Sequence, residues 1–252
     1  MSLQLYQARV DQIRNLTYDV REIGFRLIAP EEIHFKAGQF VSFEVPHPKL
    51  NKPVTRPYSI ASPPSQRDRI SLLLNLVPGG PGSTYLFSLK EGDEIRFKGS
   101  AGSFYLREEG PRDLLFVATG TGIAPFRSML DHVFERGFSR SATLYWGLRS
   151  RRDLYYQKEF EALAKRHKNF SFITTLSRTE PGSQSEWPEW HGTTGRVSKL
   201  VEERASSVTN LAVYLCGNSS MISEVSALIN KKGLCPIHKE KWYDDGGGTE
   251  PY

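Results

Sequence analysis

The stretch LLFVATGTGIAP, residues 114–125, decides how the second half of this chain folds. An apolar run typical of a buried strand leads into a turn of small residues and then into an amphipathic segment at 123–136, with Pro125 in its first turn. Gly137 follows as a suitable carboxyl-terminal cap. The apolar residues that share one face of this segment are Phe126, Leu130, Val133 and Phe134. The pattern predicts a strand, a glycine turn and a helix.

Towards the carboxyl terminus the same alternation repeats. Apolar strands are predicted at 142–148, 170–176 and 211–217, and amphipathic helices at 155–167, 197–205 and 220–233. Strands that alternate with helices in this way form a parallel sheet wound on both faces. The second half is therefore predicted to be an α/β domain.

Towards the amino terminus the pattern is different. From residue 5 to 99, short β-prone runs such as FVSFEV (40–45) and RISLLLNLV (69–77) are separated by Pro and Gly clusters, with one short helix at 83–89. This spacing predicts an antiparallel barrel or sandwich, and of the two we expect a β-barrel of Greek-key type. The period changes at REEGPRD, so we expect two domains, 1–108 and 109–252.

Composition limits the class of protein. The chain has 252 residues with 38% hydrophobic and 24% charged residues, as in a folded globular protein. Two cysteines, Cys216 and Cys235, are too few for a cysteine-ligated iron–sulfur cluster or a four-cysteine zinc site, so we expect no metal and an organic redox cofactor, if any. No export signal or membrane-spanning run is visible, which predicts a cytoplasmic protein.

The net charge of +5 favours an acidic partner or a phosphorylated ligand. The densest basic runs lie at 149–152 and 239–241, but no nucleic-acid-binding module is recognisable, so nucleic acid is not expected as a partner.

Two glycine turns suggest a ligand with several phosphates. TGTG opens a helix after an apolar strand, and GGPGST (79–84) leads into the short helix of the first half. A helix amino terminus offers free N–H groups to an anion, and small residues let a ligand approach the backbone. Each turn alone is also explained by steric need for glycine. Together with Arg56 beside Tyr58, they favour phosphate binding.

Seven motifs in order, RPYS, GGPGS, GTGIAP, LYWGLR, LSR, YLCGNSSM and EKWY, resemble those of the ferredoxin:NADP reductase family. The resemblance extends from about residue 5 to residue 243. It implies a flavin-binding barrel followed by a nicotinamide-binding α/β domain.

On this resemblance, RPYS and GGPGST hold the flavin. Arg56 would pair with the pyrophosphate, Tyr58 would lie against the ring, and Ser59 would hydrogen-bond near the flavin nitrogen that exchanges hydride. Pro57 belongs to the same motif. The pyrophosphate site is completed by Gly82, Ser83 and Thr84, which favours FAD over FMN because a dinucleotide has two phosphates.

The resemblance assigns the nicotinamide side to Thr121, Gly122 and Pro125. Cys216, followed by Gly217, would sit beside the nicotinamide carbon that gives up hydride, although most free cysteines are simply small buried residues. Cys235 has no comparable support and is interpreted as structural.

The choice of nicotinamide depends on LSR. Ser177 and Arg178 supply a hydroxyl and a cation for a phosphate on the adenosine ribose, which predicts NADP(H). Arg149 resembles the family's pyrophosphate contact, with a solvated surface arginine as the alternative.

Two departures from the family pattern are visible. Ser219 follows CGN where many members have proline, which leaves the form of that turn open. The chain continues past EKWY, so Trp242, Tyr243 or Tyr252 could cover the flavin, with Trp242 preferred. Glu240 could relay protons or be an ordinary surface charge.

We therefore expect a monomeric FAD enzyme that exchanges hydride between NADP(H) and flavin and single electrons with an acidic carrier, ferredoxin or flavodoxin. One alternative is an NAD(P)H reductase of free flavin, a cytochrome or an oxygenase component. Another is a flavin-containing electron-transfer subunit of a larger complex. A binding module without cofactor is least favoured.

Overall fold

The computed structural model describes residues 3–47, 49–108, 110–178 and 190–243. Contacts within the chain divide these residues into two compact units. The first contains residues up to 107 together with 124–137, and the second contains 108–123 and 138–243.

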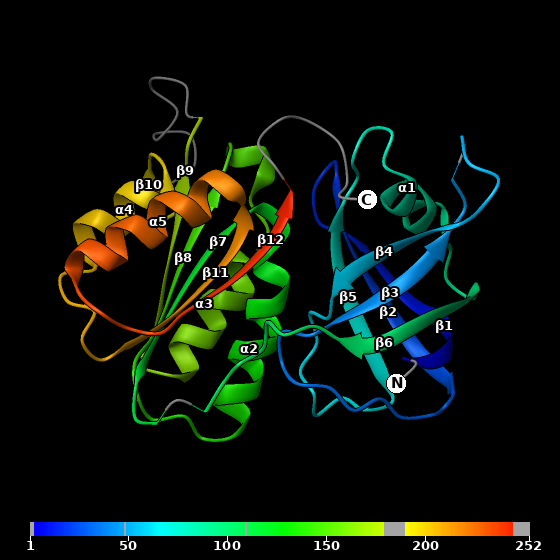
Figure 1. The fold of residues 1–252 in the computed structure, drawn as a ribbon, viewed down its shortest axis with the longest axis horizontal. Helices are drawn as coiled ribbons and strands as arrows, with labels where there is room; N and C mark the ends of the chain where they lie inside the picture. The colour runs from blue at the N-terminus through cyan, green and yellow to red at the C-terminus, as the bar shows by residue number, and fades with distance from the viewer. Residues whose placement is uncertain (1–2, 48, 109, 179–189, 244–252) are drawn as a thin grey trace. The chain divides into compact units, whose positions relative to one another are not determined.

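The first unit is built on an antiparallel sheet of six strands in the order β4-β3-β6-β1-β2-β5 (Figure 1). Its elements are β1 (Gln4–Asn15), β2 (Val20–Ala29), β3 (Phe40–Val45), β4 (Val54–Ser59), β5 (Arg69–Asn75), α1 (Pro81–Ser88) and β6 (Glu94–Ala101). Beyond β4, Ile60 forms an antiparallel bridge to Leu72 of β5, and the Ala61 amide donates to the Ser71 carbonyl at 2.8 Å. Because these contacts join the two edge strands, the curled sheet closes as the predicted barrel does.

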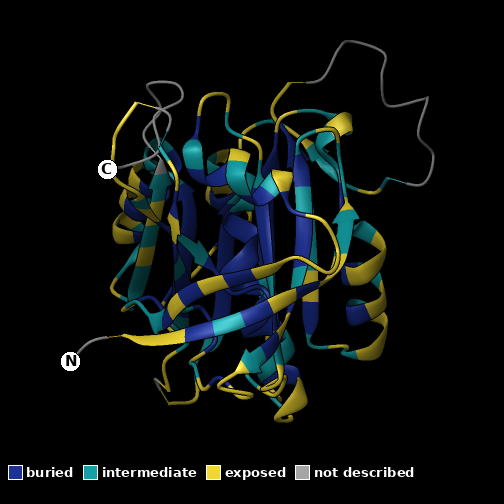
Figure 2. Cartoon of the chain, turned by 90° about the vertical axis from the view of Figure 1, so that its right-hand side faces the viewer, coloured by how far each residue is buried: buried dark blue, intermediate teal, exposed yellow. Residues whose placement is uncertain are grey.

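Alternating side chains explain the core of this unit. Val41, Phe43 and Val45 of β3 are fully buried, while the residues between them are exposed or half-buried. Phe43 packs against Phe25 and Phe97, with ring centroids 5.9 and 5.5 Å apart. Figure 2 shows the same alternation of buried and exposed residues along the strands. The apolar face of the strands therefore fills the barrel.

Helix α2 (Ala124–Glu135) packs on the first unit. Phe126 lies 6.0 Å from Phe104 between ring centroids, and a Cβ on Gly38 would meet the Met129 side chain. Arg127 pairs with the buried Glu22 at 2.6 Å. The helix has the predicted proline in its first turn, and Gly137 follows it with φ +75°.

The second unit contains a parallel sheet of six strands in the order β10-β9-β8-β7-β11-β12 (Figure 1). Its elements are β7 (Asp113–Thr119), η1 (Gly120–Ile123), β8 (Ala142–Leu148), η2 (Arg151–Asp153), α3 (Gln157–Arg166), β9 (Phe170–Leu176), β10 (Thr193–Thr194), α4 (Val197–Arg204), β11 (Leu211–Asn218), α5 (Ser219–Lys232) and β12 (Ile237–Tyr243). The predicted α/β class is confirmed. Within the described residues, no helix is long and apolar enough to cross a membrane.

The helix expected from about residue 123 starts at Ala124, directly after the short 3-10 helix η1. Two other predicted helix starts were wrong by two residues. The helix expected at 83–89 starts at Pro81, because proline suits the first turn of a helix. The helix expected from residue 155 starts at Gln157, because Tyr155 and Tyr156 are buried in the core and Tyr156 has a left-handed backbone with φ 55°. Core packing of these two tyrosines therefore overrides the local helical pattern.

Candidate functional site

In the first unit, the structure brings RPYS and GGPGST into contact. A Cβ built on Gly82 would meet Tyr58 Oη and would lie 2.8 Å from Cγ of Arg56. The Arg56 side chain is 6% exposed, and its Nη1 donates to the Thr55 carbonyl at 2.9 Å. Only glycine allows the first turn of α1 to approach the arginine and the tyrosine this closely.

The start of α1 provides amide groups for an anion. Gly80 is the N-cap and makes no side-chain capping bond, so the first-turn amides are not capped by a side chain. The helix amino terminus carries partial positive charge. A cation and an uncapped helix terminus in contact suit the pyrophosphate of a dinucleotide, so the residues present fit FAD.

The two hydroxyl residues of this turn have different surroundings. Ser83 is buried, and its hydroxyl accepts from the Val77 amide at 3.0 Å and lies 3.3 Å from the Gly80 carbonyl. Its hydroxyl therefore holds the turn together. Thr84 is exposed on the first turn of α1. Ser59 at the end of β4 is buried, and Pro57 is half-buried.

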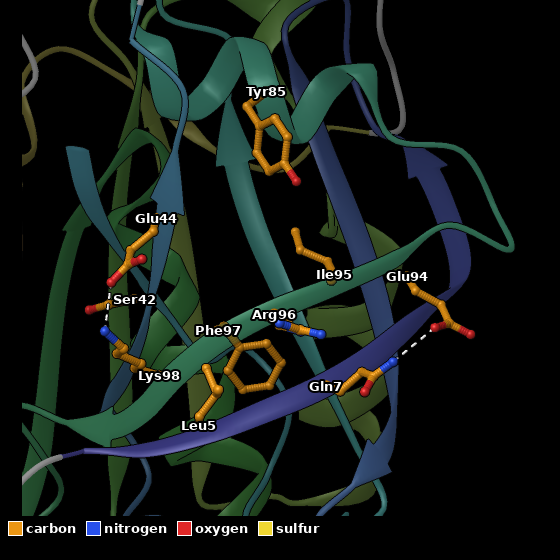
Figure 3. A pocket seen from close by; sticks show the side chains of 10 residues that line it. All are labelled: Leu5, Gln7, Ser42, Glu44, Tyr85, Glu94, Ile95, Arg96, Phe97 and Lys98. Atoms are coloured by element: carbon orange, nitrogen blue, oxygen red, sulfur yellow. Dashed lines mark hydrogen bonds and ion pairs between the residues drawn. The ribbon is translucent and has the colours of Figure 1, made fainter. Parts of the chain in front are cut away.

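A recess of about 620 Å³ lies elsewhere on the first unit (Figure 3). It is lined by residues of β1, β3, β6 and α1 and contains none of the predicted site residues. Among its lining residues, Lys98 pairs with Glu44 at 2.6 Å, and Gln7 donates to Glu94 at 2.9 Å. This recess has no feature of the predicted flavin site.

In the second unit, the TGTG turn packs on the end of β11. A Cβ on Gly122 would collide with the Cys216 carbonyl, and one on Gly217 would collide with the Thr119 hydroxyl. The Asn218 amide donates to that hydroxyl at 3.2 Å. The glycines of both motifs are thus required for the carboxyl ends of β7 and β11 to meet.

Two aromatic side chains donate hydrogen bonds to the TGTG turn. Trp146 Nε1 and Tyr155 Oη donate to the Gly120 carbonyl at 3.0 and 3.1 Å. Thr121 follows within η1 and is half-buried, and Pro125 is buried in the first turn of α2. The turn is therefore rigidly supported.

Cys216 lies at the centre of a cluster formed by β11 and β12. Its side chain is buried, and its sulfur accepts a hydrogen bond from Trp242 Nε1 at 3.1 Å. Glu240 is its register partner on β12. Burial raises the pKa of the Cys216 thiol well above its ordinary value of 9.0, the Glu240 carboxylate raises it further, and the indole N–H lowers it in part. The group is therefore a neutral thiol at neutral pH.

Asn218 begins α5 without the family's proline. Its side chain accepts from the Met221 amide at 2.9 Å, and Ser219 is the first residue of the helix. An asparagine cap thus forms the turn that the sequence left open.

A second cluster lies at the carboxyl ends of β8 and β9. The Arg178 amide donates to the Arg149 carbonyl at 2.7 Å, and the Ser177 amide donates to the Leu148 carbonyl at 3.0 Å. Both arginines and Ser177 are exposed. The structure therefore brings Ser177 and Arg178, predicted for the phosphate on the adenosine ribose, beside Arg149, predicted for the pyrophosphate.

Sequence reasoning missed Arg151, which follows β8 in η2. Its guanidinium is buried without a hydrogen-bond partner. The signal is present in the sequence, because Arg151 belongs to the basic run at 149–152, of which only Arg149 was predicted to meet a ligand. The side chain of Tyr243 and the whole of Tyr252 lie outside the described residues. Cys235 packs against the apolar core of the second unit.

Comparison with known proteins supports two domain assignments. Residues 7–105 match the model of the oxidoreductase FAD-binding domain, and residues 116–227 match that of the oxidoreductase NAD-binding domain. The chain therefore contains an FAD-binding and an NAD(P)-binding domain.

Several known proteins are similar over nearly the whole chain. Ferredoxin–NADP reductase B of Sorangium cellulosum (strain So ce56) is 36% identical over 246 residues, which cover 94% of this chain and 97% of that protein. The reductase component of phenol 2-monooxygenase from Pseudomonas sp. (strain CF600) is 32% identical over 249 residues, 96% of this chain and 67% of that protein.

Among solved structures, a ferredoxin NADP+ reductase from Neisseria gonorrhoeae with bound FAD and NADP superimposes with a TM-score of 0.79 at 22% identity. The match covers 95% of this chain and 99% of that one, and it shows that the fold is shared. Together with the two domain models and the relative that matches from end to end, it identifies this chain as a member of the ferredoxin reductase family of flavin-dependent NAD(P)H oxidoreductases.

Proposed function

We propose that this chain exchanges hydride between NADP(H) and FAD and exchanges single electrons with an acidic carrier, ferredoxin or flavodoxin. The observation that carries the proposal is the cluster around Cys216. The buried neutral thiol, together with Gly122 and Gly217, places small groups at the carboxyl end of a parallel strand, where open sheets bind ligands. A strand end with small groups suits the approach of a flat nicotinamide ring.

The residues of the first unit support FAD as the flavin. Arg56 and the amino terminus of α1 would bind the pyrophosphate, and Tyr58 would pack on the ring. Ser59, buried at the end of β4, would donate a hydrogen bond to the flavin. When bound, FAD takes up hydride as a two-electron unit and releases its electrons singly.

In the second unit, Cys216 would contact the nicotinamide and exclude water from it. Glu240, beside Cys216 in register, would hold or release a proton at its carboxylate, and Trp242 would offer its indole as a flat cover. Thr121, Gly122 and Pro125 would complete the nicotinamide side. Ser177, Arg178 and Arg149 would bind the phosphates of the nucleotide, which favours NADP(H). We propose 1–108 and 109–252 as the two functional domains.

A second candidate is the reductase component of an oxygenase. The relative from Pseudomonas sp. is such a component, and this chain spans 67% of its length. The acceptor would then be an oxygenase partner instead of a free carrier. The net charge of +5 suits an acidic partner in either case.

The purified protein would be mixed anaerobically with NADPH and, separately, with NADH while the flavin bands are followed. Loss of the bands at much lower NADPH than NADH concentration supports the NADP(H) assignment. Reduced protein is then mixed with ferredoxin, flavodoxin or cytochrome c. Rapid reduction of ferredoxin or flavodoxin supports the first candidate, and failure with both favours the oxygenase role. A colourless protein that takes up no FAD would contradict both.

A further inference from the structure

Arg151 is half-buried as a residue, but its guanidinium is shielded from solvent and has no hydrogen-bond partner. It is the first residue of η2, directly after the loop that ends β8. All three nitrogens of its guanidinium, Nε, Nη1 and Nη2, are shielded from solvent, and none makes a hydrogen bond. An arginine stays charged under all ordinary conditions, so folding has placed an uncompensated charge in the protein.

Such an arrangement is unfavourable unless an anion joins it. Burial of a charge without a partner costs more free energy than almost any other single feature of a fold. Residues that violate local rules in this way concentrate at functional sites. The buried guanidinium therefore indicates an anionic ligand.

The acid closest in sequence is already engaged. Asp153 Oδ2 accepts from both the amide and the hydroxyl of Ser150 at 2.8 Å, which closes a capping box around η2. This arrangement fixes the backbone of η2 and leaves the guanidinium of Arg151 to a ligand. The next residue, Arg152, is exposed.

The position of Arg151 on the sheet indicates which part of a nucleotide it meets. Strand order in the second unit runs β9-β8-β7-β11, so Cys216 on β11 lies two strands away from β8 (Figure 1). A dinucleotide with its nicotinamide at Cys216 would extend along the carboxyl edge of the sheet and bring its adenosine end over β8 and β9. Arg151 belongs to that end.

Ser177 alone does not satisfy a phosphate there. Its hydroxyl donates to the Leu148 carbonyl at 3.3 Å, and its amide donates to the same carbonyl at 3.0 Å. Both of its hydrogen-bond donors are thus directed at the backbone. To meet a phosphate monoester, the Ser177 hydroxyl has to turn away from the Leu148 carbonyl, and arginine side chains have to supply the other donors.

We propose that Arg151 binds a phosphate of the nucleotide, and that this phosphate is the monoester on the adenosine ribose of NADP(H). The inference rests on the proposed function. Arg151 would then be a determinant of the preference for NADP(H) over NAD(H), in addition to Arg178.

The test uses the FAD-loaded protein and the variants Arg151→Met and Arg151→Lys, with the exposed neighbour Arg152→Met as the matched control. Dissociation constants are measured for NADP+, NAD+, 2′-AMP and 5′-AMP by calorimetry. We expect Arg151→Met to weaken NADP+ and 2′-AMP by about tenfold to a hundredfold, as for loss of a charge-assisted hydrogen bond, and to leave NAD+ unchanged. Arg152→Met should change each constant by less than about twofold.

Equal weakening of NAD+ and NADP+ would assign Arg151 to the pyrophosphate and overturn the monoester assignment. Unchanged binding of all four ligands would overturn the proposal.

Thermal unfolding without nucleotide is an independent readout, because removal of an unpaired buried charge should leave Arg151→Met at least as stable as the parent. If Arg151→Met does not fold, Arg151→Lys retains the charge and should lose only the planar pairing geometry. A parent protein that binds neither dinucleotide would instead contradict the proposed function.

Discussion

The indole N–H of Trp242 on β12 donates to the sulfur of Cys216 on β11 at a distance of 3.1 Å. The two strands are parallel neighbours, and a register shift between Gly217 and Asn218 lies beside this contact. The hydrogen bond orients a fully buried thiol. It links a residue proposed for the nicotinamide with a residue proposed to cover the flavin.

Trp242→Phe keeps an aromatic ring but removes the donor. We expect the pKa of the Cys216 thiol to rise, because the indole N–H favours the thiolate, and Glu240→Gln to lower it, because a negative neighbour is lost. The ultraviolet absorbance of the thiolate reports both shifts in a Cys235→Ser background, where Cys216 is the sole cysteine. In stopped flow, flavin reduction by NADPH should slow by about twofold to tenfold in Trp242→Phe.

A double-mutant cycle with Cys216→Ala identifies the cause of that loss. If the hydrogen bond is responsible, Trp242→Phe has little effect once the thiol is absent. The same loss in both backgrounds would show that the indole acts independently of Cys216.

Stability at alkaline pH should depend on Cys216. Its folded pKa is raised above the ordinary value of 9.0, so above about pH 9 the unfolded chain releases a proton that the folded chain retains. The stability is fully present below pH 9 and falls as the pH rises, by up to about 1.4 kcal/mol per pH unit for this group. Urea unfolding of the parent and of Cys216→Ala between pH 7 and about 11 should give a shallower decline in the variant. Parallel curves would contradict the expectation, because the buried tyrosines are common to both proteins.

Local patterns predicted much of the fold. The bounds expected for β3, β8 and β9 coincide with those observed, because an alternating or continuous apolar run is itself the cause of strand burial. The predicted start of α3 was wrong because Tyr155 and Tyr156 are buried in the core instead of forming the first turn of the helix. Local preference yields where tertiary packing competes with it.

Contacts between distant segments could not be predicted in the same way. The Trp242–Cys216 bond joins residues 26 positions apart and depends on strand register. Arg151 is part of a basic run that looks like a solvated surface, and only its burial in the fold distinguishes it from Arg152. The motifs predict which residues meet a ligand, whereas the structure shows how those residues are supported.

Gly82→Ala should weaken FAD binding. The new Cβ would collide with Tyr58 Oη and press on Arg56, so one of the two predicted flavin contacts must move. We expect the dissociation constant of FAD to rise by at least about tenfold, measured by flavin fluorescence after removal and return of the cofactor. Gly79→Asn is the control on the same loop, because Gly79 has φ +75° and nothing lies within 4 Å of a Cβ there. Retention of FAD at the parent affinity in Gly82→Ala would argue against this position for the flavin.

Gly122→Ala should have the complementary effect. Its Cβ would collide with the Cys216 carbonyl and displace the TGTG turn from β11. The protein should keep its FAD, while flavin reduction by NADPH slows by about tenfold or more, because the nicotinamide surface is disturbed. Gly110→Asn, with φ +74° and open space around a Cβ, is the control in the same unit. An unaltered rate with NADPH would remove Gly122 from the nicotinamide site.

Glu22 should be important for the stability of the first unit. It is 8% exposed and pairs with Arg14 at 3.0 Å and with Arg127 of α2 at 2.6 Å. Glu22→Gln leaves two cations without their common anion, and we expect a loss of about 1–3 kcal/mol in the free energy of unfolding, since both arginines keep some contact with water. Asp68→Asn removes the exposed pair with Arg26 and should cost less than about 1 kcal/mol. Because buried pairs are screened weakly, the loss in Glu22→Gln should persist in high salt, and a loss that disappears there would mean that Glu22 behaves as a surface charge.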